Sequence, residues 1–229
     1  MTLWDNFKHQ VYKDFKEKGY RGAAFRKAFT SENIKALWKE TPKDDRLELV
    51  KDPKFGNIVK HEGYSQPTLR ALMYIREMEK YFDLNQIKHL TDFGAGYGNF
   101  IRVFDQIFHA STYTSIDFPE IHEIQKEYLD HCNIEVEFRT SDEDMSPLAS
   151  PALFLASHSL NECPMEVRDQ VEEILSRYEY IYIVYNKEFD DIDNKVYFEE
   201  LRQRLSSDYL THINFNKVTA KWSLIAVKQ

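Results

Sequence analysis

The sequence predicts an α/β protein built on a mixed seven-stranded sheet with helices on both faces. After residue 83, short strand-like runs alternate with helical runs. This alternation requires crossover helices between parallel strands. The last two predicted strands have no helix between them, so we expect an antiparallel hairpin at one edge of the sheet.

The elements of the predicted sheet region follow one another closely along the chain. The predicted strands are 87–93, 112–118, 134–140, 152–157, 180–186, 211–218 and 222–229. The predicted helices are 99–108, 119–131, 164–178 and 195–207. Tyr180 and Tyr182 alternate along one of these strands, which favours a place in the core over a sugar-stacking platform.

The N-terminal part of the chain has a helical pattern. The residues that recur at helical spacing in its first helix are Leu3, Phe7, Val11 and Phe15. A second helix is predicted over 30–40, with Thr30 or Ser31 as its cap. We therefore expect a helical extension or lid over residues 1–82 and a sheet domain over residues 83–229.

An irregular connector is predicted over residues 51–67, because this stretch contains two glycines and two prolines. A third helix should follow, with Ser65 as its cap and Pro67 in its first turn. We expect this helix to end at about Phe82.

Composition restricts the function. The formal net charge of -8 argues against binding to a nucleic-acid backbone, which requires a basic face. Cys132 and Cys163 are too few for a zinc cluster or a secreted disulfide framework, so we expect a reducing cytoplasm. The N-terminus lacks the apolar segment of a signal peptide, and no run reaches membrane-spanning length, so membrane insertion is not expected.

Three of the seven glycines, Gly94, Gly96 and Gly98, lie where the first strand of the sheet region becomes its first helix. Ligands of open α/β sheets bind at the carboxyl ends of strands, and the next helix offers unpaired N–H groups there. Because glycine lets a ligand approach the backbone closely, the cluster predicts a nucleotide-like ligand. The alternative is a tight turn without a ligand.

Acidic and basic side chains follow the other strands. Asp117 ends the second strand of the sheet region, where a carboxylate can accept hydrogen bonds from both hydroxyls of a ribose. Its alternative role is to cap the next helix. His158 follows the fourth strand and is a candidate general base, because its ordinary pKa is near 6.5. Glu162 and Asn186 are candidates for orienting an acceptor, although strand-end residues can also merely satisfy backbone groups.

The G-x-G-x-G spacing resembles the first motif of class I S-adenosylmethionine-dependent methyltransferases, which have a Rossmann-like fold. In that class the loop wraps the amino acid and ribose of the cofactor, and antiparallel strands end the sheet. The dinucleotide motif G-x-G-x-x-G would need glycine where this chain has Asn99. The resemblance implies these cofactor-binding candidates: Asp92, Gly94, Ala95, Gly96, Gly98, Asp117, Phe118, Ser141, Asp142, Ser157 and Arg70.

Three of these candidates have a more specific implied role. Ser141 and Asp142 lie in the loop that commonly covers the adenine in methyltransferases. Arg70 suits a carboxylate of the cofactor or the acceptor through its bidentate geometry, and the alternative is an exposed helical arginine.

A series of residues between about 56 and 190 carries a narrower resemblance. The series is Asp117, Pro119, Glu120, Gln125, Tyr128, Leu129, Ser159, Glu162 and Asn186. It resembles the sugar O-methyltransferase family, whose members often have methionine where this chain has Cys163. The resemblance implies in-line methyl transfer to a hydroxyl of a sugar or glycan, with His158 as the base and Glu162 and Asn186 positioning the acceptor.

The sequence allows alternatives for the base, for the acceptor and for the class of protein. Mg²⁺ is an alternative to the base, although no dense carboxylate cluster predicts a metal site. The acceptor is alternatively another small molecule or a protein. The chain is otherwise a non-catalytic S-adenosylmethionine-binding scaffold, or a nicotinamide oxidoreductase, which Asn99 disfavours.

Overall fold

The computed structural model describes residues 10, 12–14, 16–18, 34–41, 43–55, 58 and 60–229. The predicted first helix through Leu3, Phe7, Val11 and Phe15 is therefore largely outside the described residues, as are Thr30 and Ser31. The chain divides into two compact units. The helical unit is Met1–Arg76, Gly96–His109 and Phe118–Glu135. The sheet unit is Glu77–Ala95, Ala110–Asp117 and Val136–Gln229.

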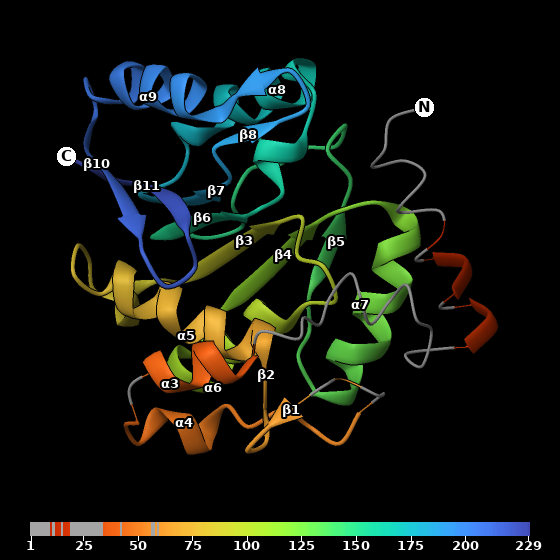
Figure 1. Ribbon diagram of the computed structural model, residues 1–229. Helices are drawn as coiled ribbons and strands as arrows, with labels where there is room; N and C mark the ends of the chain where they lie inside the picture. Colours follow the sequence, from red (N-terminus) through yellow and green to blue (C-terminus); the bar gives the residue numbers. More distant parts are fainter. Residues whose placement is uncertain are drawn as a thin grey trace. The chain divides into compact units, whose positions relative to one another are not determined.

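The sheet unit contains a seven-stranded sheet in the order β10-β11-β7-β6-β3-β4-β5 (Figure 1). Its strands are β3 (His89–Phe93), β4 (Thr112–Ile116), β5 (Glu137–Arg139), β6 (Ala152–Ser157), β7 (Tyr180–Tyr185), β10 (Tyr209–Asn216) and β11 (Lys221–Lys228). The strands from β3 to β7 pair in parallel, whereas β11 is antiparallel to both β7 and β10. The predicted mixed sheet with an antiparallel C-terminal hairpin is confirmed.

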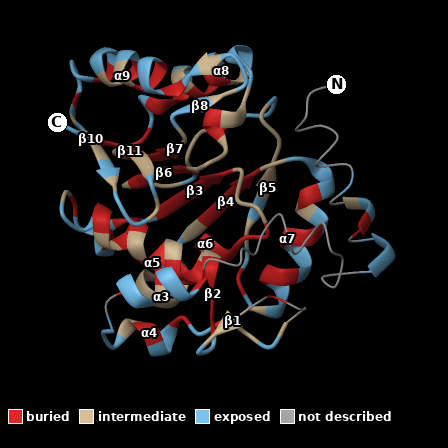
Figure 2. Ribbon diagram, viewed as in Figure 1, coloured by how far each residue is buried: buried red, intermediate tan, exposed pale blue. Residues whose placement is uncertain are grey.

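Two helices of the sheet unit, α8 (Met165–Leu175) and α9 (Asn194–Leu205), bury their apolar sides with the sheet. The cluster that they share with the strands includes Val171, Leu175, Phe198, Leu201, Phe154, Ile181 and Ile183. The central strands are buried while the outer sides of the two helices are exposed (Figure 2). Tyr182 is fully buried as predicted, and Tyr180 is half-buried against Phe82. The hairpin of β8 (Glu188–Phe189) and β9 (Ile192–Asp193) precedes α9.

The other described helices begin in the helical unit. They are α3 (Ile34–Glu40), α4 (Arg46–Leu49), α5 (Gln66–Met78), α6 (Asn99–Phe108) and α7 (Pro119–His131). In the chain, α6 connects β3 to β4 and α7 connects β4 to β5, as parallel pairing requires. Both helices have the predicted bounds.

Three predictions concern the residues around α5. Ser65 caps this helix as expected, because its Oγ accepts a hydrogen bond from the backbone N–H of Thr68 at 3.4 Å. The connector 51–67 is less irregular than predicted, since it contains an antiparallel pair, β1 (Lys60–His61) and β2 (Tyr64–Ser65). The helix also ends at Met78, and the N–H groups of Tyr81 and Phe82 close a turn on the carbonyl of Met78.

Candidate functional site

The parallel strands of the sheet unit end at one edge of the sheet, and most of the predicted site residues lie in the last residues of these strands or in the segments that follow them. These residues are Asp92, Gly94, Ala95, Asp117, Ser141, Asp142, Ser157, His158, Glu162 and Asn186. The other four, Arg70, Gly96, Gly98 and Phe118, belong to the helical unit. The glycine loop therefore passes from one unit to the other between Ala95 and Gly96.

Asp92 is a buried carboxyl group near the end of β3. Its side chain is 2% exposed. Burial, with a further contribution from the like charge of Asp117, raises the pKa of Asp92 to about 8. No cation of the described residues offsets these two effects. A buried carboxyl group of this kind is ready to pair with a positively charged ligand, which would return its pKa toward the ordinary range.

The first half of the glycine loop packs against the segment that follows β6. Gly94 has φ +71°, and its N–H donates to the carbonyl of Ile116 at 2.7 Å. A Cβ atom at Gly94 would lie 2.2 Å from the Cβ of Ser159. The Ser159 hydroxyl also donates to the carbonyl of Phe93. Glycine is thus required at position 94 by the backbone conformation and by the protein's own side chain, a reason that the sequence did not indicate.

The second half of the loop is held by α7 of the helical unit. Gly96 and Gly98 have φ values of +61° and +87°. The side-chain amide of Gln125 donates to the carbonyl of Gly96 at 2.9 Å. A Cβ atom at Gly98 would lie 2.8 Å from Cδ1 of Leu129. Two residues of the series that carried the narrower family resemblance therefore support the glycine loop.

A buried polar network supports the start of α6. The guanidinium of Arg102 is fully buried, and it donates to Asn99 at 3.1 Å, to Thr68 at 2.9 Å and to Asp52 at 3.5 Å. The Tyr128 hydroxyl donates to the same Asn99 oxygen at 3.1 Å. Burial raises the pKa of Tyr128, so it stays a neutral donor. Asn99, which stands where a dinucleotide motif has glycine, therefore links the start of α6 to Thr68 in the first turn of α5 and to Tyr128 of α7.

The remaining two candidates of the helical unit differ in exposure. Arg70 on α5 is half-buried, and its buried Nε has no hydrogen-bond partner among the described residues. Phe118 is 37% exposed and occupies the N-cap position of α7. The N-cap therefore lies one residue beyond Asp117, the residue for which capping was the alternative role.

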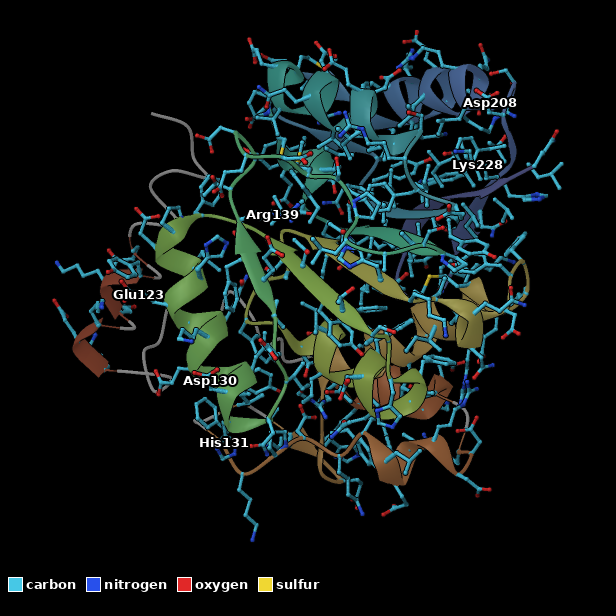
Figure 3. All side chains as sticks on the ribbon, turned by 180° about the vertical axis from the view of Figure 1, so that it is seen from behind. Glu123, Asp130, His131, Arg139, Asp208 and Lys228 are labelled. Carbon is cyan, nitrogen blue, oxygen red and sulfur yellow. The ribbon has the colours of Figure 1, made fainter. Side chains whose placement is uncertain are left out.

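The loop after β5 contains Ser141 and Asp142. Ser141 is half-buried and Asp142 is exposed. A hydrogen bond from the Thr140 hydroxyl lowers the pKa of Asp142. Arg139, labelled in Figure 3, donates to the backbone carbonyls of Asp144 at 2.6 Å and of Ser146 at 3.0 Å. The loop is thus fixed to the strand that precedes it.

Three polar candidates follow β6 and β7. His158 is half-buried, has φ +67°, and donates its backbone N–H to the carbonyl of Val184 at 2.9 Å. Burial raises the pKa of Glu162 to about 7, although the charge of Lys221 opposes this effect. The ammonium of Lys221 also donates to the side-chain carbonyl of Asn186. Lys221 therefore interacts with both Glu162 and Asn186.

Sequence reasoning missed two residues here. Lys221 begins β11, one step from the paired residues Trp222 and Tyr185, so the register of the C-terminal hairpin could have placed it beside Asn186. Asn161 is fully buried, and neither its Oδ1 nor its Nδ2 has a hydrogen-bond partner in the described part of the chain. No sequence pattern signals an unpaired amide, which depends on tertiary packing.

Within residues 60–229 and the described stretches before them, no group of three or more His, Cys, Asp or Glu side chains is arranged to hold a metal ion. None of the described helices is both long enough and apolar enough to cross a membrane.

The strand order, the C-terminal hairpin and the glycine loop after β3 define a Rossmann-like fold of the methyltransferase type. No protein-family model matches the chain, and no curated protein matches it. Solved methyltransferase structures have the same fold. The methyltransferase domain of bacterial CtHen1 has a TM-score of 0.54 and 11% identity, over 69% of this chain and 97% of that one.

Two further structures extend this comparison. An S-adenosylmethionine-dependent methyltransferase from Aquifex aeolicus has a TM-score of 0.51 and 14% identity, over 82% of this chain and 100% of that one. A precorrin-6y C5,15-methyltransferase from Geobacter metallireducens has a TM-score of 0.51 and 14% identity, over 78% of this chain and 96% of that one. At these identities the likeness establishes the fold.

Proposed function

We propose that this protein is an S-adenosylmethionine-dependent methyltransferase. The observation that carries the proposal is Asp92, a buried carboxyl group beside the like-charged Asp117 with no compensating cation among the described residues. S-adenosylmethionine carries both an ammonium group and a sulfonium group, and it supplies the methyl group for transfer. The fold and the G-x-G-x-G loop support the same cofactor.

The predicted residues divide the recognition of this cofactor between them. Asp92 pairs with its positive charge, and Asp117 accepts hydrogen bonds from the ribose hydroxyls. Arg70 of the helical unit has a buried, unpartnered Nε among the described residues, which is able to donate to a carboxylate. Ser141 and Asp142 contact the adenine. The remaining candidates keep the role that the family resemblance implies: Ala95, Gly96, Gly98, Phe118 and Ser157.

We assign the acceptor chemistry to the residues after β6 and β7. Two groups there are able to take a proton from a hydroxyl near neutral pH, His158 and Glu162. Glu162 has the stronger physical case, because burial places its pKa at about 7. Lys221 then stabilises the negative charge that develops on the acceptor oxygen, and Asn186 orients the acceptor.

The acceptor that we propose is a hydroxyl of a sugar or glycan. The family resemblance over residues 56–190 supports it, and so does the chemistry of the site. An amide both donates and accepts hydrogen bonds, as a sugar hydroxyl does, and the unpaired amide of Asn161 adjoins Glu162 in the chain. A different small-molecule acceptor or a protein acceptor is the competing outcome of the test below.

The test is calorimetric titration with S-adenosylmethionine, S-adenosylhomocysteine and NAD, followed by an acceptor screen. We expect micromolar binding of the first two ligands and at least tenfold weaker binding after Gly96→Ala, roughly the effect of misplacing a binding loop. Gly63→Ala is the matched control, because Gly63 also has a positive φ, +92°, but its added Cβ would meet Lys51 only at ordinary contact distance. Binding of NAD alone, or of none of the ligands by folded protein, would contradict the proposal.

A further inference from the structure

The sheet unit contains a buried cation that the proposed chemistry does not use. Arg168 on α8 is fully buried. Among the described residues, its guanidinium donates to three neutral oxygens: Nη2 to the carbonyl of Asn161 at 2.7 Å, Nε to the carbonyl of Cys163 at 2.9 Å, and Nη1 to the side chain of Asn194 at 2.9 Å. Burial lowers the pKa of Arg168, and no described carboxylate pairs with it. Burying an unpaired charge is costly, so this arrangement requires an explanation.

The two backbone carbonyls that Arg168 binds lie on either side of Glu162. Glu162 ends the 3₁₀ helix Leu160–Glu162, so no regular element continues through this segment to hold it. The planar fork of a guanidinium can bind two acceptors at fixed separation, which a lysine ammonium cannot do. Arg168 therefore fixes the backbone carbonyls of the two residues that flank Glu162.

A second side chain strengthens the same clamp from α9. The amide of Asn194 accepts from Arg168 and donates to the carbonyl of Asn161 at 3.3 Å. Asn194 is the first residue of α9 and is itself fully buried, directly after Asp193, whose carboxylate caps the helix through the N–H groups of Lys195 and Val196. The guanidinium also lies 4.7 Å from the ring centre of Tyr197. The guanidinium of Arg168 is thus held by Asn194, by the ring of Tyr197 and by the two backbone carbonyls.

We propose that Arg168 and Asn194 are positioning residues that hold Glu162 for proton transfer from the acceptor hydroxyl. The inference rests on the proposed function for the identity of the reaction, but the clamp itself acts on Glu162 whether or not an acceptor is bound. A well-fixed loop keeps the Glu162 carboxyl half-buried beside Lys221. A loosened loop admits water to the carboxyl group, which then becomes an ordinary exposed glutamate.

The experiment compares Arg168→Lys and Asn194→Ala with Arg204→Lys. Arg204 is a matched control, because it is an arginine of α9 that pairs with Glu172 of α8 at the protein surface. The carboxyl of Glu162 is titrated by carbon-13 NMR, with its signal assigned from the Glu162→Gln spectrum. We expect its pKa to fall from about 7 by about one unit or more in the two clamp variants and to stay unchanged in the control.

Two further measurements separate positioning from a general effect on folding. Affinity for S-adenosylmethionine should stay within about twofold in the clamp variants, whereas kcat should fall about tenfold with little change in the KM of the cofactor. An unchanged Glu162 titration in folded Arg168→Lys and Asn194→Ala protein would overturn the inference. If Arg168→Lys does not fold, Asn194→Ala decides alone, because it removes one acceptor of Arg168 and one donor to Asn161. Absence of cofactor binding in the parent protein would instead contradict the proposed function and leave the titration result valid.

Discussion

Replacing Asp92 with asparagine should increase the stability of the protein and lower its affinity for S-adenosylmethionine. The carboxyl group of Asp92 is 2% exposed, and its pKa of about 8 lies about four pH units above its ordinary value of 3.8. Each pH unit corresponds to about 1.4 kcal/mol, so folding above pH 8 costs up to roughly 6 kcal/mol for this one group. Asparagine has nearly the same shape and cannot ionise.

The pH dependence has a definite sign. Between about pH 4 and pH 8 the unfolded chain has released the proton of Asp92, while the folded protein retains it. The free energy of unfolding that this group contributes is therefore fully present below about pH 4 and is lost as the pH rises to about 8. The Asp92→Asn variant lacks this loss, so its stability advantage over the parent should grow between pH 5 and pH 8.5.

Two assays measure the consequences. Urea unfolding at pH 5 and pH 8.5 gives the stability difference, with Asp130→Asn as a control, since Asp130 is an exposed residue of α7. Titration calorimetry in buffers of different ionisation enthalpy gives the protons exchanged on binding. S-adenosylmethionine should displace close to one proton per site near pH 7 in the parent and none in Asp92→Asn, whose affinity should be at least about tenfold lower.

The reasoning would be refuted by either of two results. The first is a stability difference between parent and Asp92→Asn that does not change with pH. The second is tight cofactor binding by the parent without proton release, since Asp92 would then not be the group that meets the positive charge.

Three other substitutions test separate parts of the structure. Gly94→Ala should lower the free energy of unfolding by about 2 kcal/mol or more, because the added methyl group meets the Cβ of Ser159 at 2.2 Å. Adding Ser159→Gly to this variant should restore part of the lost melting temperature, and no recovery would contradict the contact. Asn161→Leu should leave the free energy of unfolding equal or about 1 kcal/mol higher, because it removes a buried amide that has no partner among the described residues. The rate of methyl transfer should fall about tenfold, and an unchanged rate would exclude a role in acceptor binding. Burial lowers the pKa of His89 to about 4, so about 3 kcal/mol of stability should be lost as the pH falls from 6.5 to 4. Urea unfolding of His89→Gln should show a smaller loss than that of the parent protein, and an equal loss would show that other groups cause the acid sensitivity.

The sequence predicts the fold well wherever local periodicity decides the structure. The helices 99–108 and 119–131 and the strand 152–157 have the predicted bounds, because each is a strongly patterned run between turn residues. The β1–β2 pair and the early end of α5 at Met78 were missed. Two-residue strands and a closing turn depend on contacts that single-sequence patterns do not contain.

The sequence predicts where the candidate residues lie in the fold better than it predicts which contacts hold them. Asp92, Asp117 and His158 lie at the carboxyl ends of parallel strands of the sheet unit, as the alternating pattern indicated, and their contact with a ligand stays a prediction. The glycines were expected to make room for a ligand, but Gly94 also makes room for a side chain of the protein. The roles of Arg168 and Lys221 depend on partners distant in sequence, so no spacing rule could indicate them.

The buried guanidinium of Arg102 has a consequence for the modularity of the chain. Its partners Asp52 and Thr68 both precede residue 83, where the boundary between extension and sheet domain was predicted. A chain shortened to begin at residue 83 would retain this cation without the groups that neutralise and bind it, which typically costs several kcal/mol. A substitution at Asp52 or Thr68 therefore removes a partner of Arg102 on the helix that follows the glycine loop, although both positions lie outside the predicted sheet domain.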